Sequence, residues 1–336
     1  MQQLTYPLTS AQMGMYYEWK KDKEQTRYNN PFLYEFPETI DTERLKDAYV
    51  KLIEAHSFLT LRLKTLGNGD VVQYFVPDVP VNIPVIETVA EGLRERVLSG
   101  IRPFDLLAGE PLYRIVIYKT PFRVYVFMYI HHIAYDVSSS IVFHRDLAKA
   151  YNGETLSKET LTCAQFALLE AERMRGEEYK RDEAYFREKL SGTTPAKLPI
   201  LKRSEEAAGT LDKVSEYVDY KQIIDYCKRL EISPNNLFAG ALGICLNQYT
   251  REKKLCFCTA HNGRIDERVR ESVGMFVKTL PVVVVPDPLL SLADYLQGIR
   301  SDMKELWLHQ TYPFSEMATH YGVAMDLTYT FQKWIL

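Results

Sequence analysis

Apolar residues along this chain follow two spacings, one typical of helices and one typical of strands. The helical spacing, with apolar side chains recurring every three or four positions, predicts helices at residues 8–19, 41–53, 139–151, 163–191, 220–230, 234–249 and 291–308. Runs rich in β-branched and aromatic residues predict strands at residues 58–66, 71–76, 110–119, 123–135, 255–260, 279–286 and 325–331. Hairpin connections in the first half indicate mixed sheets, so the predicted fold class is α/β.

One segment, residues 193–215, lacks periodicity and is rich in Pro, Lys, Glu, Ala and Gly, which is typical of a connection between folded units. The chain of 336 residues is long enough for two such units. We therefore predict an N-terminal lobe at residues 1–192 and a C-terminal lobe at residues 216–336.

The strand at residues 123–135 is the most informative stretch, because nearly every side chain of residues 124–130 is apolar or aromatic. Such a strand is expected to be covered on both faces. His131 and His132 follow this run directly, and Asp136 lies four residues after His132. Two imidazoles and a carboxylate at the end of a buried strand are the groups that a proton-handling site requires. Because side chains alternate along a strand, the two imidazoles are expected to face opposite sides and to have different roles.

The same residues are also compatible with ordinary structural roles. A histidine at the end of a buried strand can hydrogen-bond a carbonyl group, and an aspartate before Ser138 and Ser139 can cap a helix. No phosphate-binding glycine loop is present, so no nucleotide cofactor is predicted. A metal site is not predicted, because no ligand spacing is found around the other histidines, which are His56, His144, His261, His309 and His320.

Composition and charge exclude several classes of partner. The formal net charge is −3 and the charges are interspersed, so neither a nucleic-acid partner nor a basic membrane-binding patch is predicted. The N-terminus lacks the basic region and apolar run of a signal peptide, and no stretch is long enough to span a membrane. The five cysteines form neither a CxxC pair nor an even set for disulfides, so a reducing, cytoplasmic location is expected.

Residues 131–137, His-His-Ile-Ala-Tyr-Asp-Val, resemble the HHxxxDG signature of condensation domains of nonribosomal peptide synthetases, within the chloramphenicol-acetyltransferase-like superfamily. Other segments resemble motifs of the same family, in the same order along the chain. They are Ser10 to Met13 with Tyr16 and Tyr17 (SxAQxRxW), residues 56–62 (RHExLRT), Gly263 and Arg264 with residues 273–281 (GR…VGxFVNTLP), and residues 309–314 (HQDYPFE).

The resemblance implies two lobes with mixed sheets, arranged in a V around a central tunnel. It implies an acyltransferase that forms an amide bond between a donor acyl or aminoacyl thioester and an aminoacyl acceptor. Each substrate would be attached through phosphopantetheine to a donor or an acceptor peptidyl carrier protein. Neighbouring synthetase domains are implied as further partners, and no cofactor of its own is implied.

By the same resemblance, His132 is the catalytic residue and His131 is its structural neighbour. Asp136 is expected to form a buried ion pair with Arg264 that joins the two lobes. The other matching positions are expected to shape the tunnel and the substrate site, and they are Ser10, Gln12, Arg62, Gly274, Phe276, Lys278, Thr279, Gln310, Tyr312 and Phe314. A structural role fits two of these segments equally well, namely a strand start at residues 274–277 and a helix start at residues 312–314.

Three departures from the family pattern bear on activity. Val137 stands in place of the glycine of the signature, and Lys278 stands in place of an asparagine. The chain also ends after a strand that other family members continue, so the C-terminal lobe is expected to be incomplete. A β-branched residue at position 137 matters if the backbone there needs a positive φ or must lie close to a pantetheine arm.

Two alternative functions remain open at this point. One is a stand-alone acyltransferase that takes its acyl group from CoA or from a carrier protein. The other is a degenerate, non-catalytic condensation-like domain that docks carrier proteins or partner enzymes without forming bonds.

Overall fold

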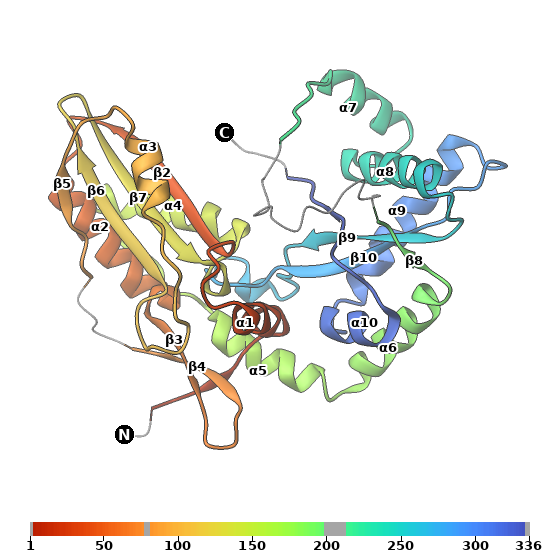
Figure 1. Cartoon of the computed structure of the whole chain (residues 1–336), viewed down its shortest axis with the longest axis horizontal. Helices are drawn as coiled ribbons and strands as arrows, with labels where there is room; N and C mark the ends of the chain where they lie inside the picture. The colour runs from red at the N-terminus through yellow and green to blue at the C-terminus, as the bar shows by residue number, and fades with distance from the viewer. Residues whose placement is uncertain (1–2, 77–80, 198–212, 333–336) are drawn as a thin grey trace. The chain divides into compact units, whose positions relative to one another are not determined.

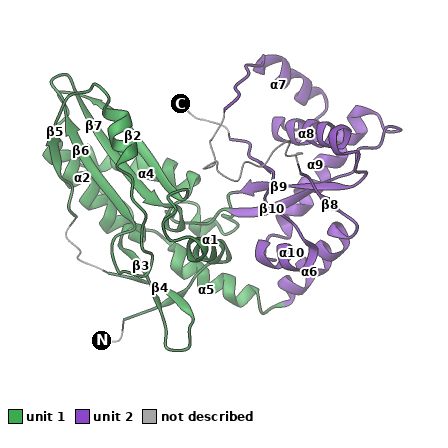
Figure 2. Cartoon of the chain, in the orientation of Figure 1, with its two compact units in different colours: residues 1–176, 262–277 green, residues 177–261, 278–336 purple. Residues whose placement is uncertain are grey.

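The computed structural model describes residues 3–76, 81–197 and 213–332 (Figure 1). The chain divides into two compact units, shown in different colours in Figure 2. Unit 1 comprises Met1–Gly176 and Asn262–Val277, and unit 2 comprises Glu177–His261 and Lys278–Leu336. This division differs from the predicted lobes, because residues 262–277 pack with unit 1. Most of the predicted connection and the last residues of the chain lie outside the described residues, so the predicted lobe limits stay a prediction.

Unit 1 contains a mixed four-stranded sheet in the order β2-β7-β6-β5. Its strands are β2 (Asn29–Pro37), β7 (Arg123–His131), β6 (Tyr113–Lys119) and β5 (Val85–Glu87). β7 is antiparallel to both of its neighbours, and β5 runs parallel to β6. The prediction that β7 is covered on both faces is confirmed, because Val126 and Phe127, which point to opposite faces, are 0% and 4% exposed.

A smaller antiparallel sheet in unit 1 has the order β1-β4-β3. It joins β1 (Tyr6–Pro7), β4 (Val71–Phe75) and β3 (Leu61–Thr65). A hairpin turn connects β3 and β4, and Gly69 adopts there a φ of 92°, which an L side chain rarely tolerates.

The helices in the described part of unit 1 are α1 (Ser10–Lys21), α2 (Thr42–Ala55), α3 (Leu93–Ser99), α4 (Val137–Tyr151) and α5 (Cys163–Arg173). Side chains that accept hydrogen bonds from the first turn fix four of these starts: Thr9 before α1, Asp41 before α2, Asp136 before α4 and Thr162 before α5. The predicted apolar stripe of α2 is buried, and α2 and α4 share one core with the large sheet, where Tyr49 contacts Phe143.

Unit 2 has a second mixed sheet, formed around β9 (Leu255–His261). β10 (Lys278–Val284) pairs with β9 in antiparallel fashion, whereas β8 (Thr194–Pro195) and β11 (Thr328–Tyr329) pair with it in parallel. The helices in its described part are α6 (Glu177–Leu190), α7 (Tyr220–Arg229), α8 (Pro234–Thr250), α9 (Leu292–Leu308) and α10 (Phe314–Tyr321). Each unit therefore buries its own core between helices and a sheet.

Some sequence-based boundaries were wrong. The strand predicted to reach residue 135 ends at His131, and a short 3₁₀ helix, His132–Ala134, follows. The single helix predicted at residues 163–191 is two helices, α5 and α6. The strand predicted at residues 325–331 is limited to Thr328–Tyr329. No strand was predicted for β2, because Pro31 and Pro37 interrupt its pattern. Both prolines are tolerated here because β2 lies at the edge of the sheet.

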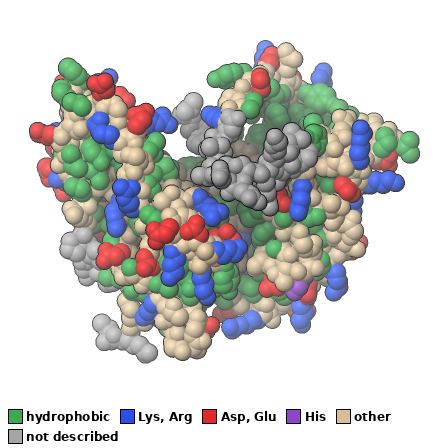
Figure 3. Space-filling model, viewed as in Figure 1, with side chains coloured by type: hydrophobic (Ala, Val, Ile, Leu, Met, Phe, Trp, Pro, Cys, Tyr) green, Lys and Arg blue, Asp and Glu red, His purple; other side chains and the backbone are tan. Residues whose placement is uncertain are grey.

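No helix within the described ranges is long and apolar enough to cross a membrane. On the face of the molecule shown in Figure 3, acidic and basic side chains are interspersed.

Helix α8 packs closely at Gly243 against Tyr295 of α9 and Val284 of β10, and a substitution of this glycine tests that packing. A Cβ atom at Gly243 would lie 2.7 Å from Tyr295 Oη and 3.0 Å from Val284 Cγ1, so Gly243→Ala overpacks the core of unit 2. We expect it to lower the free energy of unfolding by about 1–3 kcal/mol. Gly298 in α9 has nothing within 4 Å of its Cβ position, so Gly298→Ala should instead raise that free energy by about 0.5–1 kcal/mol. Chemical denaturation followed by circular dichroism measures the free energy of unfolding of both variants. Equal effects of the two substitutions would contradict the close packing of Gly243 against Tyr295 and Val284.

Candidate active site

The two histidines occupy different structural positions at the end of β7. His131 is the last residue of the strand, and His132 begins the 3₁₀ helix. The strand stops here because His131 Nδ1 accepts a hydrogen bond from the backbone N–H of Ile133 at 3.1 Å. The backbone N–H of His132 donates to the carbonyl oxygen of Tyr28 at 2.7 Å. These two bonds hold the turn that presents His132.

His131 is buried at the end of β7. It is 3% exposed and packs edge-on against the ring of Phe104. Burial, together with the neighbouring imidazole of His132, lowers the pKa of His131 to about 3. His131 is therefore neutral and serves as a buried hydrogen-bond acceptor for the turn.

His132 is half-buried, and its tautomer follows from one hydrogen bond. Its Nδ1 lies 2.7 Å from the carbonyl oxygen of Tyr135. A carbonyl oxygen can only accept, so Nδ1 carries the proton and donates it. In the neutral ring, Nε2 then keeps its lone pair and can accept a proton.

The ring of His132 forms part of the wall of a pocket with a volume of 190 Å³. The other lining residues come from β2, from the turn before α4 and from the first residue of α4, and they are Asn30, Pro31, Phe32, Tyr135, Asp136 and Val137. The contribution of β2 was not predicted from the sequence, because its pattern did not indicate a strand. The pocket combines an imidazole that can accept a proton with a mainly apolar wall.

Asp136 forms the predicted buried ion pair with Arg264. Arg264 Nη1 donates to Oδ2 at 2.9 Å and Nη2 donates to Oδ1 at 3.0 Å, and the two side chains are 5% and 0% exposed. Asp136 Oδ1 also accepts hydrogen bonds from the backbone N–H and the hydroxyl of Ser139, both at 2.8 Å. The backbone N–H of Phe276 donates to Oδ2 at 3.0 Å. The carboxylate is thus fully surrounded by donors, as a buried charge requires.

Two expectations about Asp136 are resolved by this geometry. Asp136 is also the N-cap of α4, so the structural interpretation and the ion-pair interpretation of this residue are both correct. The expectation that the pair joins two lobes is wrong for the compact units, because residues 262–277, which carry Arg264, belong to unit 1 together with Asp136. The ion pair instead fixes this returning segment within unit 1.

Residues 272–276, which we call the clamp segment, pack directly beside this ion pair. The hydroxyl oxygen of Ser139 accepts a hydrogen bond from the backbone N–H of Gly274 at 3.0 Å and lies 2.9 Å from the carbonyl oxygen of the same residue. The guanidinium of Arg264 lies over the ring of Phe276, with its Cζ 4.5 Å from the ring centre. A Cβ atom at Gly274 would lie 2.5 Å from Cys163 Cβ, so only glycine fits there. Close packing explains why the segment has glycine at this position.

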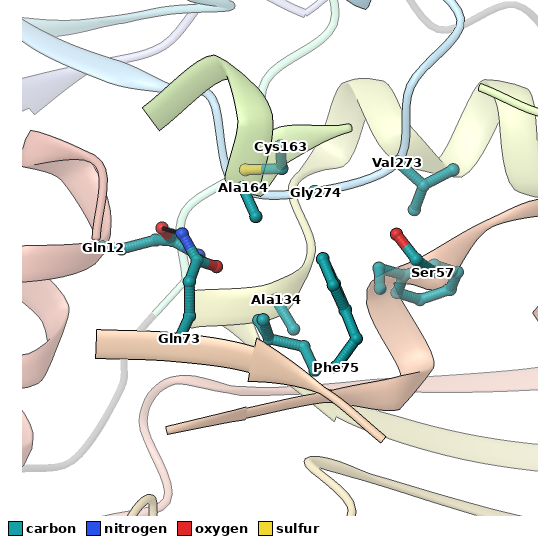
Figure 4. Close-up of a pocket in the computed structure, with 11 residues that line it drawn as sticks. Gln12, Ser57, Gln73, Phe75, Ala134, Cys163, Ala164, Val273 and Gly274 are labelled. Atoms are coloured by element: carbon teal, nitrogen blue, oxygen red, sulfur yellow. Dashed lines mark hydrogen bonds between the residues drawn. The ribbon is translucent and has the colours of Figure 1, made fainter. Parts of the chain in front are cut away.

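The 3₁₀ helix that carries His132 is also held from α1 and β4. Gln12 Nε2 donates to the carbonyl oxygen of Ile133 at 3.1 Å and lies 3.2 Å from Gln73 Oε1. Gln73 in turn donates to the carbonyl oxygen of Pro7 at 2.7 Å. The two amides point toward one another at the edge of a second, small cavity, which Ala134 and Gly274 also line (Figure 4). Gln73 was missed in the sequence, where a single glutamine in a strand carries no distinguishing signal.

The sequence matches a model of the family described as "Condensation domain" over residues 2–334. The chain belongs to this family. It is 26% identical over 331 residues to bacitracin synthase 1 of Bacillus licheniformis, covering 96% of this chain and 6% of that protein. The chain therefore spans only a small part of the length of the curated relatives it matches.

Two solved structures show the same fold. The first condensation domain of the calcium-dependent antibiotic synthetase, in complex with a substrate analogue, matches with a TM-score of 0.78 and 18% identity, covering 97% of this chain and 80% of that one. The X-domain from teicoplanin biosynthesis, which has also been solved in complex with OxyB, matches with a TM-score of 0.82 and 19% identity, covering 94% of this chain and 74% of that one. The resemblance and the mixed α/β fold predicted from the sequence are confirmed.

Val137 departs from the signature of condensation domains without straining the backbone. Among the described residues other than glycine, only Glu231 and Arg251 have a positive φ, so position 137 needs no glycine for its conformation. Val137 is the first residue of α4, is 48% exposed and lines the pocket beside His132. Its effect on this condensation domain is therefore to take up space in the pocket.

Two further predicted residues of the condensation domain make internal contacts in unit 1. The backbone N–H of Ser10 donates to Glu170 Oε2 of α5 at 2.6 Å, and its hydroxyl bonds the same carboxylate. Arg62 is 3% exposed and donates from Nε to the carbonyl oxygen of Gly109 at 2.9 Å. Neither residue lines the pocket of His132, and a role in shaping a tunnel stays a prediction for both.

The remaining predicted residues of the condensation domain belong to unit 2, namely Lys278, Thr279, Gln310, Tyr312 and Phe314. Lys278 and Thr279 begin β10. Gln310 donates to the carbonyl oxygen of Trp307 at 2.7 Å and lies 3.2 Å from His261 Nδ1. Phe314 starts α10, so the helix-start interpretation of residues 312–314 is correct.

A buried carboxylate that the sequence analysis missed holds this part of unit 2. Asp182 in α6 is 0% exposed and accepts hydrogen bonds from His309 Nδ1 at 2.9 Å and from the backbone N–H of Thr311 at 3.0 Å. Arg181 donates to it as well. In the sequence, Asp182 is one acid among many in a charged helix, so nothing distinguished it.

The buried ion pair predicts a large effect on stability. Asp136→Ala leaves the Arg264 guanidinium buried without its partner, so we expect the free energy of unfolding to fall by about 3–5 kcal/mol. Glu35→Ala removes the partner of Arg123 in a pair whose side chains are 57% and 52% exposed, and it should cost less than about 1 kcal/mol. Thermal and chemical unfolding of both variants measure the difference. An Asp136→Ala protein that is as stable as wild type would show that this pair does not hold the clamp segment.

Proposed function

We propose that this chain catalyses amide bond formation between a donor acyl or aminoacyl thioester and an aminoacyl acceptor, each attached to a carrier protein through phosphopantetheine. The observation that supports this most is the setting of His132. Its Nδ1 is fixed by the carbonyl of Tyr135, Nε2 can accept a proton, and the ring forms part of the wall of a 190 Å³ pocket. Membership in the condensation domain family supports the same reaction.

In this reaction the amine nitrogen of the acceptor attacks the thioester carbonyl carbon of the donor. A carbon–nitrogen bond forms and the carbon–sulfur bond breaks, so the nitrogen must lose one proton and the sulfur must gain one. His132 Nε2 accepts the proton from the nitrogen and returns it to the departing sulfur. His131 takes no part in this transfer, because burial lowers its pKa to about 3 and its Nδ1 is bonded to Ile133.

Alignment of the two substrates contributes more to the rate than proton transfer does. A positioned general base typically contributes about 10²–10⁴-fold, whereas alignment of two reactants corresponds to effective molarities of about 10⁵–10⁸ M. The turn from His131 to Ala134, with the Asp136–Arg264 pair behind it, would supply this alignment by keeping the pocket wall rigid.

The finer features of this proposal come from the family resemblance. They are a V-shaped arrangement of two lobes around a tunnel, donor and acceptor carrier proteins and neighbouring synthetase domains as partners, and a cytoplasmic location. Ser10, Gln12 and Arg62 in unit 1 and the five candidates of unit 2 would shape that tunnel. The relative from Bacillus licheniformis is itself a synthase of which this chain matches only 6%, which supports a role as one domain among several.

A second candidate is a docking module that forms no bond. Val137 supports it, because this side chain occupies part of the pocket where the family signature has glycine. The likeness to the X-domain of teicoplanin biosynthesis supports it as well, since that domain has been solved in complex with another protein, OxyB.

Replacement of His132 tests the catalytic proposal directly. We expect His132→Ala to lower the rate of amide formation by about 10²–10⁴-fold, because the proton acceptor is lost while the pocket and the fold remain. The measurement is intact-protein mass spectrometry of a donor-loaded and an acceptor-loaded carrier protein. His144→Ala is the matched control, since His144 lies on the exposed side of α4 and outside the pocket.

Two outcomes of this assay would redirect the proposal. A folded wild-type protein that binds the carrier proteins but forms no amide would favour the docking module. Equal rates with a donor attached to CoA and a donor attached to a carrier protein would favour the stand-alone acyltransferase.

Blocking the pocket provides an independent test of where the reaction occurs. Val137→Trp places a large ring in a 190 Å³ pocket, so we expect loss of amide formation with little change in melting temperature, because Val137 is 48% exposed. Ile141→Trp is the control, since Ile141 lies one helical turn further along α4, is 65% exposed and does not line the pocket. Full activity of Val137→Trp would show that substrates bind elsewhere.

A further inference from the structure

A second cluster of charged groups in unit 1 surrounds His56, the residue at the end of α2. The imidazole is 2% exposed and lies between two carboxylates. Nε2 is 2.9 Å from Asp146 Oδ2, and Nδ1 is 3.0 Å from Glu159 Oε1. Asp146 belongs to α4, whereas Glu159 lies in the connection between α4 and α5. The catalytic proposal uses none of these three residues.

The geometry favours a protonated His56. Each ring nitrogen faces a carboxylate oxygen, which can only accept, so both nitrogens must carry hydrogen. Burial alone would lower the pKa of His56, but the hydrogen bonds to Glu159 and Asp146 outweigh burial and raise it above its usual value. The pKa of Asp146 is lowered although burial opposes this, because Arg145 and His56 donate to it.

The other charged groups around this cluster come from α4 and from residues 262–277. Arg145 bonds Asp146 at 2.8 Å and also reaches Glu271. Lys149 Nζ lies 3.9 Å from Asp146 Oδ1. These cations face Asp146, whereas Glu159 faces His56, so loss of the imidazolium charge acts most strongly on Glu159.

Glu159 connects His56 to the clamp segment. Its Oε1 accepts a hydrogen bond from the backbone N–H of Val273 at 2.7 Å, and its side chain is 2% exposed. Its Oε2 is buried and has no hydrogen-bond partner in the described part of the chain. A carboxylate in this position depends on a nearby positive charge, because an unpaired buried charge is strongly unfavourable. Val273 is followed by Gly274, which bonds Ser139 of α4.

We infer that His56 is a positioning residue that fastens the clamp segment to α4 by holding Asp146 and Glu159 at once. The clamp segment donates to the Asp136 carboxylate through the backbone N–H of Phe276, and Asp136 caps the helix that follows His132. His56 therefore acts on the active site through the backbone, without contacting a substrate. Its influence on catalysis rests on the proposed function, whereas the fastening of the clamp segment does not.

Deprotonation of His56 releases this fastening. Because the pKa of His56 is higher in the fastened state than its usual value of 6.5, the stabilisation is fully present below about pH 6.5. It is lost as the pH rises through the raised pKa of His56. The clamp segment should therefore open more often at alkaline pH. The increase is up to about tenfold for each unit by which the pKa of His56 in the fastened state exceeds its usual value of 6.5.

Hydrogen exchange of the Val273, Gly274 and Phe276 amides measures this opening. The exchange rates are recorded by NMR between about pH 6 and about pH 9 and corrected for the intrinsic dependence of exchange on pH. For wild type we expect protection of these amides to fall with rising pH. His56→Gln should show low protection at every pH, because glutamine supplies no charge for Glu159. The imidazole resonances of His56 should titrate above 6.5.

Two further variants keep the test decisive. His144→Gln changes a histidine of α4 that bonds no carboxylate, and it should behave like wild type. Glu159→Gln keeps a carbonyl oxygen for the Val273 amide but removes the buried charge, so protection of Val273 should become independent of pH. This variant remains informative if His56→Gln fails to fold.

The inference is overturned if wild-type protection is independent of pH, if His56→Gln retains wild-type protection, or if His56 titrates below 6.5. It is supported if protection follows the expected pattern even when no amide is formed by the wild-type protein. In that case the fastening role of His56 stands and the proposed catalytic function fails.

Discussion

The buried ion pair between Asp136 and Arg264 is the interaction on which the rest of the site depends. Taking both charges out of water costs several kcal/mol for each ion, and only good geometry with further hydrogen bonds offsets this. The chain meets this condition by surrounding Asp136 with donors from Ser139 and Phe276 and by placing the Phe276 ring against the guanidinium. These donors come from α4 and from the clamp segment. The hydrogen bonds to Asp136 therefore also hold two distant parts of the sequence against each other. Because Asp136 is the N-cap of α4, these contacts also hold the start of α4 and the preceding turn that carries His132.

The environment, and not the residue type, separates the roles of the two adjacent histidines. His131 ends a buried strand, so burial keeps its ring neutral and its Nδ1 is used by the backbone of the turn. His132 lies one residue further on, where the strand has given way to a 3₁₀ helix and the ring reaches a pocket. A third histidine, His56, shows the opposite effect, because two carboxylates raise its pKa despite its burial. His131 and His56 lie in the same unit, but burial lowers the pKa of His131, whereas hydrogen bonds to two carboxylates raise the pKa of His56.

Both units use a buried carboxylate to hold a segment that has little regular structure. In unit 1, Asp136 holds the clamp segment, and in unit 2, Asp182 binds His309 and the backbone of Thr311. Segments of this kind cannot pair all of their backbone groups in a helix or sheet, so a side-chain acceptor at the end or on the face of a helix supplies the missing partner. For this reason, residues that match family motifs and lie far apart in the sequence bind the same buried carboxylate. Arg264 and Phe276 bind Asp136, and His309 and Thr311 bind Asp182.

The sequence by itself determined the local features, because they depend on residues close together along the chain. These include the capped helices at Thr9, Asp41 and Asp136, the buried strand β7, and the burial of His131 at its end. The family motifs also placed Arg264 opposite Asp136. Only the tertiary structure decided that residues 262–277 pack into unit 1, that β2 contributes part of the pocket wall, and that Gln73, Glu159 and Asp182 form hydrogen bonds to distant parts of the chain. These partners are separated by tens of residues and look ordinary in the sequence, since a single Gln, Glu or Asp acquires its role only from the backbone groups that folding brings within hydrogen-bond distance.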